Sequence, residues 1–210
     1  MRIRHRGRRS HIRKCFIMSH EPEDLPPEGE AREGPLPDDA ASLGEPIPKI
    51  LHSFYEDRPF VSCTRCGESL MDFEEGYRIS KNFNKDECLI EYALCLPCLD
   101  AMLDEASEES KVALARFQAE NLREVSGFNE CALCEKKFDA VKGGDYSFAG
   151  VCQGGRMLDS AMVCFDCMEA MANVMSEETK RTWDKFREEN FPGVPSDFEP
   201  FPNQGAPIVF

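Results

Sequence analysis

The sequence predicts an α+β fold in which one small unit occurs twice in tandem. Eight of the eleven cysteines form four Cys-x-x-Cys pairs, and these pairs divide into two sets of two. The leading pair recurs after 68 residues and the trailing pair after 69. Within each set, short apolar and aromatic runs typical of strands separate the two pairs, and a pattern of helical period follows the second pair. A repeat of this length indicates a duplicated structural unit.

The cysteine pairs have the spacing of metal ligands. Four thiolates in two such pairs suit the tetrahedral coordination of zinc, and a site filled by four thiolates is normally structural. We therefore expect two zinc ions, one in each unit. The predicted ligands are Cys63, Cys66, Cys95 and Cys98 in the first unit, and Cys131, Cys134, Cys164 and Cys167 in the second.

Each unit begins with a tight turn at the leading pair, followed by a hairpin. Gly67 supplies the backbone freedom that such a turn requires, whereas the second unit has Glu135 at that place. The predicted strands are the apolar runs at 77–83 and 89–94 in the first unit and at 146–152 and 157–163 in the second.

A helix is expected to begin at each trailing pair. Pro97 is acceptable in a first turn, and Asp166 has the charge that a helix N-terminus favours. Ser107 and Ser176, each followed by two glutamates, are typical N-caps. The sequence therefore predicts a short helix, a break at the serine and a longer helix to about Asn121 or Asn190; a continuous helix is the alternative, because the apolar phase is uninterrupted.

The order of cysteine pair, hairpin, cysteine pair and helix resembles the treble-clef superfamily of zinc modules. The eight paired cysteines carry this resemblance, which covers roughly residues 61 to 191 in two copies. It implies a fold and a structural metal. Members of the superfamily include nucleic-acid binders, adaptors and nucleases, so the resemblance leaves the activity open.

The repeats divide the chain into four parts. Residues 1–48 form a predicted disordered tail, because 19–48 is acidic and contains several prolines and glycines. Residues 49–125 and 126–191 are the two zinc modules, called module 1 and module 2 below. Residues 192–210 are a proline- and phenylalanine-rich tail that cannot be regular structure, and we expect it to wrap over helix surface rather than to recognise a partner.

The start of the chain is basic and has several interpretations. Residues 1–17 contain seven Arg or Lys and no acid. They are either an arm that grips phosphate or, as we favour, a segment that is not translated because the true start is Met18; a mitochondrial presequence is a third interpretation. The first apolar stretch, 45–55, is expected to pack across module 1, with a docking motif as the alternative.

Histidine usage argues against an enzyme. The four histidines all precede the first cysteine pair; they are His5, His11, His20 and His52. A catalytic zinc commonly needs histidine ligands and an open coordination position, and both predicted sites are filled by thiolates. Cys15, Cys88 and Cys152 lie outside the sets; Cys88 and Cys152 are expected to be buried apolar residues.

Charge weighs against nucleic acid as the partner. The net charge is −14. Acidic residues outnumber basic ones in both segments that run from a leading to a trailing cysteine pair, 63–98 and 131–167. Such a surface repels a polyanion unless one face is segregated. We therefore expect a cytoplasmic, non-enzymatic protein that binds another protein, either a monomer with its two repeats paired about a pseudo-two-fold axis or a homodimer. A nucleic-acid-binding zinc protein and a thiol-based sensor are the alternatives, and no apolar run of membrane-spanning length exists.

Overall fold

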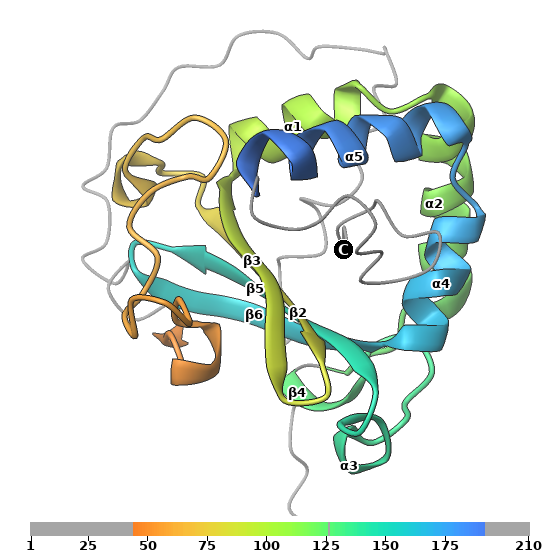
Figure 1. Cartoon of the computed structure of the whole chain (residues 1–210), viewed down its shortest axis with the longest axis horizontal. Coiled ribbons are helices and arrows are strands. Elements are labelled where there is room, and N and C mark those ends of the chain that lie inside the picture. The colour runs from red at the N-terminus through yellow and green to blue at the C-terminus, as the bar shows by residue number, and fades with distance from the viewer. Residues whose placement is uncertain (1–43, 126, 192–210) are drawn as a thin grey trace, which may run out of the picture. The chain divides into compact units, whose positions relative to one another are not determined.

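A computed structural model describes residues 44–125 and 127–191, and all of these belong to one compact unit. The predicted C-terminal tail, most of the predicted N-terminal tail and Cys15 lie outside the described residues. Within them the fold combines α-helices with one six-stranded sheet, in agreement with the predicted α+β class (Figure 1). None of the described helices is long and apolar enough to cross a membrane.

The elements of module 1 follow the predicted order. Two short 3-10 helices at Lys49–Leu51 and Leu70–Asp72 precede the hairpin. The hairpin and the helices after it are β2 (Tyr77–Asn84), β3 (Glu87–Cys95), α1 (Leu96–Asp104) and α2 (Glu108–Asn121).

Module 2 shows the same order. Strand β4 (Gly127–Cys131) and the short helix α3 (Phe138–Val141) flank its leading cysteine pair. The hairpin and helices that follow are β5 (Asp145–Gln153), β6 (Arg156–Cys164), α4 (Phe165–Asn173) and α5 (Glu177–Asn190).

One sheet joins the two hairpins. Its strand order is β1-β6-β5-β2-β3, where β1 is Glu45–Pro46, and β4 is added parallel to β6. The antiparallel pair β2–β5 lies in the middle, and in its register Ser80 is opposite Ala149, the residue 69 positions further along the chain. The two hairpins also share their irregularity, since a β-bulge follows Asn82 in one and Val151, again 69 positions later, in the other.

Both helical segments break at the predicted serine. The Ser107 hydroxyl accepts a hydrogen bond from the backbone N–H of Ser110, and the Ser176 hydroxyl accepts one from that of Thr179. These caps satisfy donors at the start of α2 and α5, so the break is confirmed and a continuous helix is wrong.

The two breaks contact each other through a hydroxyl cluster. The Ser107 and Ser176 oxygens are 2.9 Å apart. Each serine backbone N–H donates to a hydroxyl of the other module: Ser107 to Thr179 at 3.0 Å and Ser176 to Ser110 at 2.8 Å. The modules are therefore joined at a second place, remote from the sheet (Figure 1).

Helix α5 of module 2 lies against strand β3 of module 1. The Phe186 ring is 5.7 Å from that of Tyr92, 6.4 Å from that of Trp183 and 6.0 Å from that of Phe191. Four methionines are buried: Met102 on α1, Met168 and Met171 on α4, and Met175 in the break between α4 and α5.

The segment before module 1 is more ordered than predicted. Glu45–Pro46, which we assigned to the disordered tail ending at residue 48, forms β1 and pairs with β6 of module 2. The fully buried Leu51 lies against Gly150 of β5, where a Cβ atom would come within 2.4 Å of the leucine side chain. Since any larger side chain would collide there, glycine makes room for this segment, which therefore packs on both modules and not on module 1 alone.

Candidate metal centres

The leading cysteine pair of module 1 is a tight turn fixed to strand β3. The Cys63 N–H donates to the Glu68 carbonyl, and the Gly67 N–H donates to the Cys63 carbonyl, both at 2.8 Å. Gly67 has φ 77°, a left-handed conformation that glycine adopts without strain. The Thr64 N–H donates to the carbonyl of Ala93 at 2.7 Å, which places the turn beside the end of β3.

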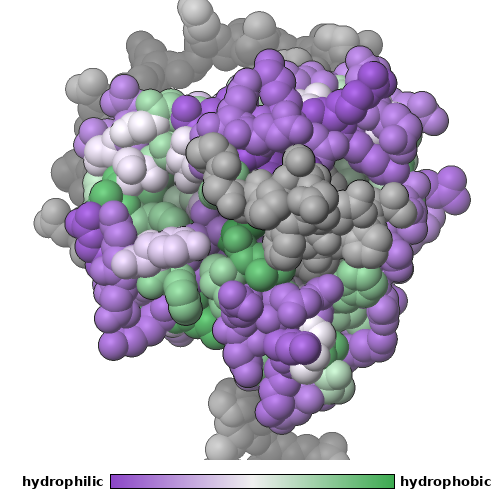
Figure 2. Space-filling view, viewed as in Figure 1, coloured by the Kyte–Doolittle hydropathy of each residue, from purple (hydrophilic) through white to green (hydrophobic). Residues whose placement is uncertain are grey.

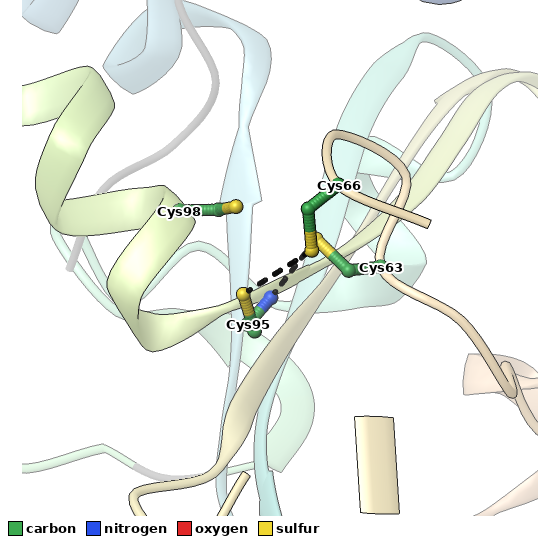
Figure 3. A group of neighbouring side chains, drawn as sticks. All are labelled: Cys63, Cys66, Cys95 and Cys98. Atoms are coloured by element: carbon green, nitrogen blue, oxygen red, sulfur yellow. Dashed lines mark hydrogen bonds between the residues drawn. The ribbon is translucent and has the colours of Figure 1, made fainter. Parts of the chain in front are cut away.

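The trailing pair of module 1 lies where β3 becomes α1. Cys95 is the last residue of β3 and the N-cap of α1, and Cys98 follows in the first helical turn. Pro97 is accommodated there because the first-turn N–H groups have no intrahelical partner. Figure 3 shows the Cys98 sulfur directed from α1 toward the sulfurs of the leading pair.

The four sulfurs of module 1 have the separations of a tetrahedral metal site. All four lie within 4.8 Å of one another, and the Sγ atoms of Cys66 and Cys95 are 4.0 Å apart. Zinc–sulfur bonds of about 2.3 Å in a tetrahedron give sulfur–sulfur distances of about 3.8 Å. The Cys95 N–H also donates to the Cys63 sulfur at 3.4 Å, a contact that stabilises a thiolate (Figure 3).

Module 2 builds the same arrangement. Its four cysteine sulfurs again lie within 4.8 Å of one another, and those of Cys134 and Cys164 are 3.5 Å apart. The Cys164 N–H donates to the Cys131 sulfur at 3.5 Å. Glu135 occupies the place of Gly67 with φ 60°, so here a residue with a Cβ atom holds the left-handed conformation.

The extra residue of module 2 lies before its hairpin. In the β2–β5 pair, Ser80 lies opposite the residue 69 positions later, Ala149. The leading cysteine pairs of the two modules are only 68 positions apart. Between the leading pair and the hairpin, module 1 has the three-residue 3-10 helix and module 2 the four-residue helix α3. The insertion therefore changes neither site.

Within each cluster the pKa is lowered for one thiol and raised for a neighbouring one. At Cys63, burial raises the pKa, but hydrogen bonds from the backbone N–H groups of Cys66, Cys95 and Arg65 outweigh it and lower the pKa to about 7. Burial raises the pKa of Cys95 to about 11. In module 2, hydrogen bonds from the Cys164 and Cys167 thiols lower the pKa of Cys131, and the bond to Cys131 raises that of Cys164 to about 12. Four adjacent sulfurs can all be anionic only with a cation among them, so each group is suited to hold a metal ion.

Basic side chains connect each turn to the following helix, a feature that cysteine spacing alone does not indicate. Arg65 donates to the Cys98 carbonyl at 3.2 Å and to the Glu105 carboxylate at 2.5 Å. In module 2, Lys136 forms an ion pair with Asp166 at 2.5 Å. The pairs are partly or largely solvent-exposed, so they orient the turns and add little stability.

Cys88 and Cys152 lie outside both clusters. They are 8% and 0% exposed, as expected of buried apolar residues, and burial raises the pKa of each thiol to about 12. Both are therefore protonated at neutral pH and are poor nucleophiles.

No protein-family model, curated protein or solved structure matches this chain.

Proposed function

We propose that each cluster holds one structural zinc ion and that the protein is a non-enzymatic adaptor whose two treble-clef-like modules arose by tandem duplication. The observation that carries the proposal is the pair of four-thiol groups with equivalent surroundings. Each has a turn fixed to an edge of the hairpin and a second pair at a helix start. Zinc is the metal that prefers four thiolates in a closed tetrahedral site.

The equivalent registers support duplication. Ser80 faces its own counterpart Ala149, and Ser107 contacts its own counterpart Ser176. An approximate two-fold axis that passes between Ser80 and Ala149 and between Ser107 and Ser176 would relate the two modules, as such an axis relates the subunits of a dimer. On this proposal the chain is a monomer that reproduces a dimeric arrangement.

A structural role for the metal follows from the ligand set. Four thiolates occupy every position of a tetrahedral zinc, which leaves no place for an activated water or a substrate carbonyl. The sequence from residue 53 onward contains no histidine that could replace a thiolate or act as a general base. The two ions therefore contribute to folding rather than to catalysis.

A protein partner fits the surface better than nucleic acid does. The net charge of −14 disfavours a polyanion, and hydrophilic side chains cover the visible surface around α5 (Figure 2). By contrast, Phe54 and Tyr55 are 61% and 82% exposed and form an edge-to-face pair outside the core. Exposed aromatic side chains of this kind are typical of protein-binding surfaces.

Metal analysis of the purified chain tests the structural role. We expect two zinc ions per chain, and loss of one of them in either Cys66→Ser or Cys134→Ser. Cys88→Ala is the matched control, because this buried cysteine belongs to neither cluster and its variant retains both ions. Chain that is metal-free yet remains fully folded in excess chelator contradicts the proposal.

Affinity capture from the native cell at two salt concentrations tests the adaptor role. A protein that remains bound at high salt supports the proposal. Nucleic acid that is recovered at low salt and lost at high salt favours the alternative of a nucleic-acid-binding zinc protein.

A further inference from the structure

The two outer strands of the sheet are covered differently. Strand β6 pairs on its outer side with β1, where Glu45 is opposite Met157 and Pro46 is opposite Arg156, and also with β4. Strand β3 stands at the other end of the strand order, and among residues 44–125 and 127–191 no strand pairs with its outer side. An uncovered edge presents backbone donors and acceptors to an added strand.

The uncovered part of β3 is short. Toward its end, the Ala93 carbonyl accepts from the Thr64 N–H. Before that, the Glu91 carboxylate accepts from the Ser53 hydroxyl at 2.8 Å and from the Phe54 N–H at 2.7 Å. Glu87–Ile90 precedes both contacts, and among the described residues the one recorded bond to its backbone outside the β2 ladder is weak, from the Cys88 thiol to the Ile90 carbonyl at 3.9 Å.

The first two residues of this stretch match the part of β6 that β1 covers. At the offset of 69 residues, Glu87 corresponds to Arg156 and Cys88 to Met157. Arg156 donates from Nε and Nη2 to the Gly44 carbonyl, at 3.0 and 2.7 Å, and so holds β1 in place. Glu87 is exposed and has the opposite charge, so the equivalent place on β3 suits a donor of positive charge instead of a carbonyl group.

An aromatic pair is attached next to this stretch, at Glu91. The Phe54 backbone is tied to the Glu91 carboxylate, which also forms a buried ion pair with Lys81 at 3.0 Å. Lys81 donates in addition to the His52 carbonyl at 2.5 Å. The loop that carries Phe54 and Tyr55 is thus fixed to β3, while both rings remain exposed to solvent.

We propose that Glu87–Ile90 binds an extended segment of a partner protein as an added antiparallel strand, with a lysine or arginine of that segment opposite Glu87. Backbone hydrogen bonds supply affinity in this mode of recognition, and side chains supply specificity. Phe54 and Tyr55 contact the same segment and favour a cation near their rings. The inference rests on the proposed adaptor function, since it names the surface and the chemistry of the partner.

Hydrogen exchange of the full, zinc-loaded chain tests the open edge. We expect the amides of 87 and 88 to exchange faster than those of 156 and 157, because β1 pairs only with the latter. Equal protection of the two segments means that another part of the chain already covers β3, and that result overturns the proposal.

Peptide selection then tests the partner chemistry. A random 12-residue peptide library displayed on phage is panned against the full chain, and enriched peptides are measured by fluorescence anisotropy. We expect basic, extended sequences whose affinity falls about fivefold or more in Glu87→Lys, but not in the control Glu188→Lys on α5. N-methylation of the peptide backbone in the paired stretch is expected to weaken binding by about tenfold, because it removes a ladder hydrogen bond.

The outcomes separate this inference from the adaptor function. Failure to enrich any peptide, or binding that withstands both Glu87→Lys and N-methylation, overturns the edge site. Self-association that Glu87→Lys abolishes identifies a second copy as the occupant and also overturns it. A captured protein partner that binds Glu87→Lys as well as the unaltered chain leaves the adaptor function standing and removes only this site.

Discussion

Replacing Phe186 with alanine tests how the two modules are held together. Phe186 belongs to α5 of module 2 but packs on Tyr92 of module 1, and it is 8% exposed. Truncating a buried phenylalanine costs about 3–5 kcal/mol, because the transfer energy is lost and a cavity remains. For a domain of this size, each kcal/mol lowers the melting temperature by about 2–4 °C. The expected decrease is therefore roughly 6 to 20 °C.

The chain supplies its own matched control. Phe117 lies 69 positions before Phe186, on α2, but it is only half-buried. The residue that corresponds to Tyr92 in module 2 is Ala161, which offers no aromatic ring to Phe117. Folding buries less apolar surface of Phe117 than of Phe186. Phe117→Ala is therefore expected to lower the free energy of unfolding by only about 1–2 kcal/mol.

Thermal unfolding followed by circular dichroism in excess zinc measures both variants. We expect Phe186→Ala to lower the melting temperature by at least twice as much as Phe117→Ala, with two zinc ions retained in each protein. If either substitution were neutral, packing between the modules would not contribute to stability, and the paired arrangement would be refuted. Equal losses would contradict the argument from Tyr92 and Ala161.

Three further substitutions or reactions test local features. Glu135→Gly is expected to stabilise the chain by about 1 kcal/mol in urea unfolding, because glycine adopts the left-handed φ of 60° without strain; a loss of stability would contradict this. Lys81→Met is expected to cost about 3–5 kcal/mol in the same assay, because it leaves the Glu91 carboxylate buried without its cation; a change below 1 kcal/mol would show that water reaches the pair. Iodoacetamide at pH 7.5 is expected to spare Cys88 and Cys152 in the native chain and to reach them only well above pH 9, because burial raises their pKa to about 12; mass spectrometry of digested protein reads this out.

Features that depend on a few neighbouring residues could be predicted from the sequence. Cysteines two residues apart can form only a tight turn or a helix start, so the eight cysteines that the structure brings together were identifiable in advance. Serine followed by two glutamates is a local capping signal, and both helices after the caps end at the predicted residues, Asn121 and Asn190.

Features that depend on contacts between distant segments could not be predicted. Alternating apolar residues indicate a strand but not its neighbour, so the β2–β5 pairing that unites the modules was missed. The same holds for β1, where two residues join a strand more than 100 positions away. Lys81 and Glu91 are charged residues on strands, and only the folded chain shows that they are 4% and 7% exposed and paired.

A duplicated chain can differentiate surfaces that a homodimer must keep identical. In a symmetric dimer both edge strands are the same, so both are covered or both are open. On the proposed duplication, the equivalent positions here have diverged in charge: Arg156 holds a short strand of the same chain on β6, whereas Glu87 occupies that place on β3. Covering both edges would leave only side chains for recognition, and opening both would expose the chain to edge-to-edge aggregation. On the proposed duplication and edge site, one covered edge and one short, acidic open edge limit edge-to-edge aggregation and leave a place on β3 for a partner strand.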